Sequence, residues 1–140
     1  MTPELRDAFR NTRYQLYLPA GTVALAVDQY CAALGEWMRA NSCTCAAWMT
    51  AFNPASQLCE TTANTAAQQQ LESRLATAYT LAQGTAIDPS GHWPPEPSVL
   101  VAGMSCAVAM RITRELGQLA FLWCDADAIP RLLETAQVSR

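Results

Sequence analysis

Alternating hydrophobic and polar residues predict a β-hairpin near the start of the chain. Apolar side chains recur at every second position along 14–18 and again along 23–27, which is the period of a strand with one buried face. Pro19-Ala20-Gly21 separates the two stretches, and Gly21 adopts a positive φ without strain. Further strands are predicted at 46–52, 80–87, 98–102 and 119–124, of which the last two are almost wholly apolar and so typical of strands buried on both faces.

Apolar residues at helical spacing predict five helices between and after these strands. The first begins at Pro3 behind a capping Thr2, and the fourth begins behind Ser105 and ends at Gly117. The third has a thin, alanine-rich apolar stripe, which favours a close approach to a sheet. The predicted helices cover about 3–12, 29–41, 62–79, 106–116 and, behind a capping Asp127, 128–133.

These elements together predict an α+β fold. The helix at 106–116 joins the strands 98–102 and 119–124 as a βαβ unit, so we expect those strands to be parallel, with a right-handed crossover. With the hairpin, this gives a mixed β-sheet of about five to six strands, antiparallel at its start and parallel at its centre, with helices packed on it. The length of 140 residues suits a single domain over 1–140.

Composition and charge exclude several classes of binding partner and of chemistry. Charged residues make up 15% of the chain and its formal net charge is −3, so it lacks the basic density of nucleic-acid-binding proteins. All basic residues are Arg, which excludes lysine chemistry. No apolar run reaches the roughly 18 residues of a membrane span, and the charged start is unlike a secretory signal. We therefore expect a cytoplasmic protein with reduced cysteines, no nucleic-acid or membrane partner and, without a phosphate-loop or nucleotide motif, no cofactor.

The most constrained stretch of the chain is the proline-rich segment 88–98. Its first four residues, Asp-Pro-Ser-Gly, have the composition of a type I turn. Three prolines between Trp93 and Ser98 then fix φ and bias the residues before them towards extended geometry. Glu96 is consequently held on a rigid backbone at the entry to a buried strand.

Polar side chains gather at the exit of strand 46–52 and at the entry to strand 98–102. If these strands are antiparallel neighbours, the two ends share one edge of the sheet. Glu96 is then a candidate catalytic acid or base, or an acceptor for a cationic or hydroxyl group, and Trp93 an apolar wall. The ligand-binding candidates are Asn53, Ser56, Asn64, Trp93, Glu96 and Ser98. The alternative is that the Asn and Ser residues only form turns and caps and that the Trp fills the core.

Other candidate chemistry is sparse. His92, the single histidine, is expected in a surface loop, with an acid–base role beside Glu96 as the alternative. Asp125 and Asp127 follow a buried strand and are candidate Mg²⁺ ligands, although helix capping by Asp127 explains the pair more simply. Cys43-Thr44-Cys45 has neither the spacing nor the second ligand pair of a zinc site.

Two motifs resemble the signature of a small bacterial family, domain of unknown function 3293. They are Trp48-Met49-Thr50-Ala51-Phe52-Asn53-Pro54-Ala55-Ser56 and Trp93-Pro94-Pro95-Glu96-Pro97-Ser98, with Asn64 and Leu71 between them and Gly117-Gln118-Leu119-Ala120 after them. The resemblance extends from Tyr14 to about Leu133. It implies a stand-alone bacterial protein of this size and groups Gln118 with the candidate residues, but it implies no activity.

The sequence therefore favours a small polar-ligand-binding domain, with or without catalysis. Its site lies at the rim formed by the Asn53–Ser56 and Trp93–Ser98 segments. The alternative is a non-catalytic protein-interaction module or homodimer in which these residues are purely structural. The first hypothesis requires the two segments to meet in space.

Overall fold

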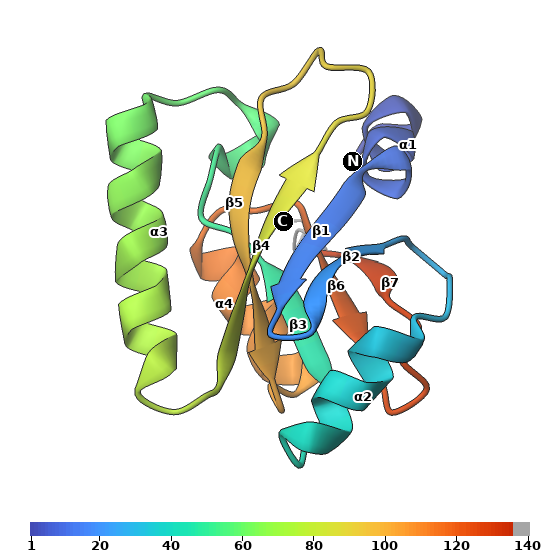
Figure 1. Ribbon diagram of the computed structural model, residues 1–140. Helices are drawn as coiled ribbons and strands as arrows, with labels where there is room; N and C mark the ends of the chain where they lie inside the picture. The colour runs from blue at the N-terminus through green and yellow to red at the C-terminus, as the bar shows by residue number, and fades with distance from the viewer. Residues whose placement is uncertain (136–140) are drawn as a thin grey trace.

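One curled β-sheet of seven strands runs through the computed structural model, which describes residues 1–135 (Figure 1). The strand order is β2-β1-β4-β5-β3-β6-β7, and every neighbouring pair is antiparallel. The elements are α1 (Pro3–Asn11), β1 (Arg13–Leu18), β2 (Gly21–Leu25), α2 (Ala32–Ala40), β3 (Ala46–Met49), the 3₁₀ turn η1 (Pro54–Ser56), α3 (Thr61–Ala76), β4 (Leu81–Ile87), β5 (Glu96–Ala102), α4 (Cys106–Glu115), β6 (Ala120–Cys124) and β7 (Arg131–Glu134). The predicted α+β class is confirmed, with more strands than the expected five to six.

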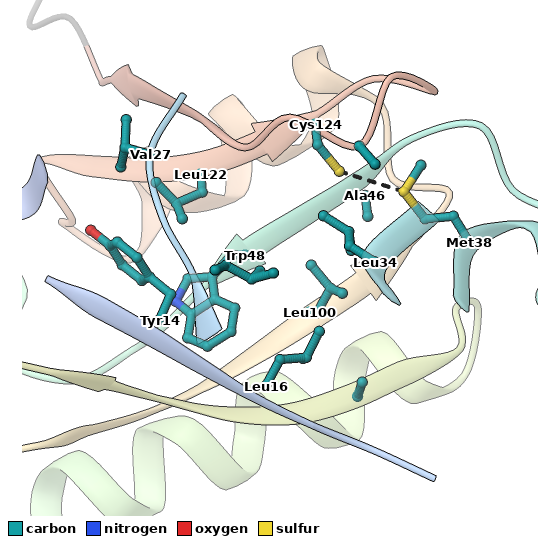
Figure 2. Close-up of a cluster of buried hydrophobic side chains, with 13 residues drawn as sticks. Tyr14, Leu16, Val27, Leu34, Met38, Ala46, Trp48, Leu100, Leu122 and Cys124 are labelled. Atoms are coloured by element: carbon teal, nitrogen blue, oxygen red, sulfur yellow. Dashed lines mark hydrogen bonds between the residues drawn. The ribbon is translucent and has the colours of Figure 1, made fainter. Parts of the chain in front are cut away.

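The sheet separates two hydrophobic clusters. On one face, Met49, Val99 and Val101 pack against α3 and α4. On the other, which we call the inner face, Leu100 and Trp48 pack with Leu34 and Met38 of α2 and with other strand residues (Figure 2). Helix α1 lies on the inner-face side too, at the other end of the sheet from α2 (Figure 1). Within the described residues, no helix is long and apolar enough to cross a membrane.

The βαβ unit is present, but its strands are not neighbours. β5 and β6 are both antiparallel to β3, so they run in the same direction with β3 between them. The expected pairing of parallel strands at the centre is therefore wrong. Helix α4 has ten residues, and a crossover of this kind returns the chain to the sheet without fixing how many strands it passes over.

The predicted last helix at 128–133 is also wrong. The side chain of Asp127 accepts a hydrogen bond from the backbone N–H of Ile129 (3.1 Å) and forms a turn rather than a helix cap. β7 follows and pairs with β6. Its two leucines alternate as in a strand, since Leu132 packs on the inner face and Leu133 on the face of α3 and α4.

The inner face depends on one glycine. Trp48 is 4% exposed and packs edge to face against Tyr14, with ring centroids 5.5 Å apart. A Cβ placed on Gly84 of β4 would lie 2.6 Å from Cζ3 of Trp48 and 2.8 Å from the backbone oxygen of Gln15. Gly84 therefore provides the space that the indole ring occupies.

We expect Gly84→Ala to lower the free energy of unfolding by about 1–3 kcal/mol, the usual cost of overpacking a core. Urea denaturation measures this loss. The control is Gln83→Ala on the same strand, where the side chain is exposed and only its hydrogen bond to Glu72 is lost, so the change should stay below about 1 kcal/mol. Equal losses for the two variants would show that Trp48 moves aside without cost.

Candidate functional site

The site is built on a buried segment that leaves the sheet after β3. Residues 51–53 are buried but lie beyond the last ladder pair of β3, so side chains replace the missing strand as hydrogen-bond partners. Gln68 Oε1 accepts from the N–H of residue 51 (2.7 Å), and Asn64 Oδ1 accepts from the N–H of residue 53 (3.0 Å). Gln118 Nε2 donates to the carbonyl oxygen of residue 52 (2.8 Å).

Asn53 has a left-handed backbone conformation (φ 48°, ψ 61°), which Asn tolerates better than most residues. Its side-chain oxygen accepts hydrogen bonds from Asn64 Nδ2 (2.7 Å) and from the backbone N–H of Cys59 (2.9 Å). Both partners are donors, so they fix which end of the amide is the oxygen. The Nδ2 group therefore points to Glu96 Oε2, at 2.8 Å.

Glu96 is the first residue of β5 and is half-buried. Its Oε2 atom accepts hydrogen bonds from Asn53 Nδ2 (2.8 Å) and from the indole Nε1 of Trp93 (2.9 Å). Oε1 accepts no hydrogen bond from residues 1–135. The carboxylate is thus held in place through one oxygen, while the other retains its capacity to accept.

The turn before Trp93 is held by Asp88. The Ser90 hydroxyl donates to this carboxylate (2.7 Å), as do the backbone N–H groups of Ser90 (2.9 Å) and Trp93 (3.0 Å). These hydrogen bonds lower the pKa of Asp88, and the one from the Ser90 hydroxyl has the largest effect. His92 Nδ1 lies 3.1 Å from the same hydroxyl. Because that hydroxyl donates to the carboxylate, the ring nitrogen acts as a donor here, and His92 does not activate the serine as a base.

A cavity of about 690 Å³ lies between α1, the 88–93 loop and the inner face of the sheet. Five of the six ligand-binding candidates line it: Asn53, Ser56, Trp93, Glu96 and Ser98. The sixth, Asn64, lies behind Asn53 and holds its amide. The expected meeting of the two segments therefore occurs, because β3 and β5 are antiparallel neighbours.

Tyr14 closes part of the cavity wall. Burial is the main cause that raises the pKa of its hydroxyl, and the charge of Glu96 adds to the effect. The hydroxyl donates to the carbonyl oxygen of Phe9 at 2.6 Å. Tyr14 is therefore a neutral, already paired group that supplies an aromatic surface.

The two aspartates proposed for Mg²⁺ lie away from this cavity lining. Asp127 forms an ion pair with Arg131 at 2.6 Å, and Asp125 accepts from the backbone N–H of Ala126. Residues 1–135 contain no group of three or more His, Cys, Asp or Glu side chains placed to hold a metal ion. The Mg²⁺ site remains a prediction that this geometry does not support.

Sequence reasoning overlooked Gln68, which supports the site from behind. Asn64 and Gln68 are four residues apart and continue the buried side of α3 formed by Leu71 and Leu75. Two amides on the buried side of a helix are a signal that backbone groups nearby need partners. This pattern was present in the sequence.

We expect the stability of Asn53→Asp to depend on pH. The new carboxylate would replace a donor that lies 2.8 Å from Glu96 Oε2, and repulsion would raise the folded-state pKa of the pair above the unfolded values. Such groups lose stabilisation as the pH rises. The melting temperature of the variant should therefore fall relative to wild type between about pH 4 and 7.

The control for this experiment is Asn53→Ala, which removes the same hydrogen bonds without adding a charge. The difference between its melting temperature and that of wild type should change much less across that pH range. If the melting temperature of Asn53→Asp differed from that of wild type by the same amount at every pH, the contact between Asn53 and Glu96 would be contradicted.

Comparison with known proteins places the chain in a family. Residues 49–121, more than half of the chain, match the family model described as protein of unknown function (DUF3293), and all six ligand-binding candidates lie within the match. The matched region is shorter than the Tyr14–Leu133 resemblance. No curated protein and no solved structure matches. The chain belongs to the domain of unknown function 3293 family.

Proposed function

We propose that this protein binds a small polar molecule in the cavity beside Glu96. The supporting observation is the half-satisfied carboxylate. Asn53 and Trp93 hold one oxygen of Glu96, while the other accepts no hydrogen bond from residues 1–135. A ligand that donates a hydrogen bond to this oxygen would complete the coordination of the carboxylate.

The size and lining of the cavity agree with this proposal. Small-molecule sites typically measure about 300–1,000 Å³ and combine apolar walls with a few placed polar groups. The cavity of about 690 Å³ has Tyr14, Trp48 and Leu122 in its wall and Glu96, Asn53 and Ser98 among its polar groups. Several of these polar side chains are fixed by hydrogen bonds within the fold, which lowers the entropy lost on binding.

If the protein is an enzyme, Glu96 is its candidate acid or base. Its partners are neutral donors, which orient a carboxylate without adding a cation beside it. Ser90 and His92 do not form a nucleophile–base pair, because the serine hydroxyl donates to Asp88. Proton transfer by Glu96 is therefore the chemistry that this arrangement favours.

The interaction-module alternative has less support. Within residues 1–135, the large apolar side chains that are exposed come from separate segments: Tyr17 from β1, Tyr30 from the loop before α2, and Leu58 from the loop after η1, with Met1 at the chain start. Scattered apolar residues of this kind are ordinary on protein surfaces.

A thermal-shift screen against a metabolite library tests the proposal, with Glu96→Gln as the key variant. Glutamine keeps the shape of the side chain, and its amide oxygen can still accept from Asn53 and Trp93, so the fold should persist. Compounds that stabilise wild type should bind this variant about tenfold or more weakly, because a hydrogen bond to a charged acceptor is lost.

Glu36→Gln is the matched control, because Glu36 is exposed on α2 and does not line the cavity. Its ligand responses should equal those of wild type. A library without any stabilising compound, or compounds that stabilise wild type and Glu96→Gln equally, would overturn the proposal.

A further inference from the structure

We infer that the ligand is an organic cation, a protonated amine carried on an apolar body. This inference rests on the proposed function and names the chemical class that the same cavity would select. Three independent properties of the lining support it: the sign of its charges, the direction of its unfilled hydrogen bonds, and its aromatic surface.

Among the described residues, four carboxylates line the cavity, and His92 is the only basic side chain in the lining. The carboxylates are those of Glu4, Asp7, Asp88 and Glu96. The nearby arginines of α1 are engaged elsewhere, since Arg6 pairs with Glu134 (2.8 Å) and Arg10 with Asp28 (2.9 Å). The cavity therefore has a negative potential, which attracts cations and repels anions.

The unfilled hydrogen-bonding positions are mainly acceptors. Glu96 Oε1 accepts nothing from residues 1–135, and neither does the side-chain oxygen of Gln118, a residue that is 7% exposed and lines the cavity. Two of the donors are used, since the Tyr14 hydroxyl binds Phe9 and the Trp93 indole binds Glu96. The indole N–H of Trp48, which also lines the cavity, donates to no group of residues 1–135. Ser56 has a hydroxyl that serves either role. A ligand that fits this lining must donate hydrogen bonds, as an ammonium group does with three protons.

Aromatic rings complete the recognition. Phe9, Tyr14, Trp48 and Trp93 all line the cavity. Trp93 meets the same carboxylate through the N–H edge of its indole (2.9 Å to Oε2), so it orients Glu96, while cation–π attraction needs a ring face turned towards the ammonium group. The remaining rings suit an apolar carbon skeleton. A bare metal ion would fit less well, because residues 1–135 offer no cluster of three metal-binding side chains.

Three probes with similar skeletons and different charge test the inference: 2-phenylethylamine, 2-phenylethanol and phenylacetate. Calorimetric titration of the full chain should show the amine binding about tenfold or more tightly than the alcohol, and phenylacetate binding more weakly still. Added salt should weaken the binding of the amine and leave the binding of the alcohol unchanged. Glu96→Gln should reduce the affinity for the amine to that for the alcohol, whereas Glu36→Gln should keep the preference.

The outcomes separate this inference from the proposed function. Equal or tighter binding of the alcohol or of phenylacetate would overturn the cationic class, while a loss of that binding in Glu96→Gln would still support the cavity as a ligand site. Binding of none of the three probes at millimolar concentration would also overturn the inference. The library screen would then test the proposed function separately.

Discussion

The structure depends on hydrogen bonding of a backbone segment that is buried but lies outside any strand pair. Residues 51–53 leave the sheet beneath α3 and the end of α4, where water cannot serve as partner. A buried backbone group without a partner costs about 1–3 kcal/mol. Gln68, Asn64 and Gln118 satisfy these groups from α3 and from the residues after α4. The position of Asn53 follows from these bonds, because they fix the backbone that leads up to it.

The hydrogen bonds around Asn53 also orient a side chain that lines the cavity. Asn64 and the N–H of Cys59 occupy the oxygen of Asn53, so its amide nitrogen is the atom that meets Glu96. Trp93 adds the second donor from a loop that Asp88 holds closed. The structural and functional interpretations of the polar residues are therefore compatible. Asn64 and Gln68 support the fold, Asn53 links the fold to the cavity, and Glu96 has capacity that the fold does not use.

Local patterns predicted most of the elements, with the helix expected at 128–133 as the exception, but they could not determine the pairing between strands. The Thr2 and Ser105 caps form as expected, with hydrogen bonds from Leu5 and Val108. Strand periodicity shows which residues share a face, but not that β3 separates β5 from β6, because neighbours in a sheet are chosen by long-range packing. The contact between Asn53 and Glu96 followed only once β3 and β5 were antiparallel neighbours, which the sequence offered as one possibility.

The cavity itself follows from side-chain size along the inner face. At one end of the sheet, large residues such as Leu16 and Leu100 fill the space under α2. Towards α1 the same face has Ala86, Ser98 and Ala120, which line the cavity, and Ser98 lies opposite Gly84 in the ladder. Larger side chains at these positions would extend the core and bury more apolar surface. The small residues near Glu96 therefore leave a space beside its carboxylate. An amine bound in that space would contact the carboxylate.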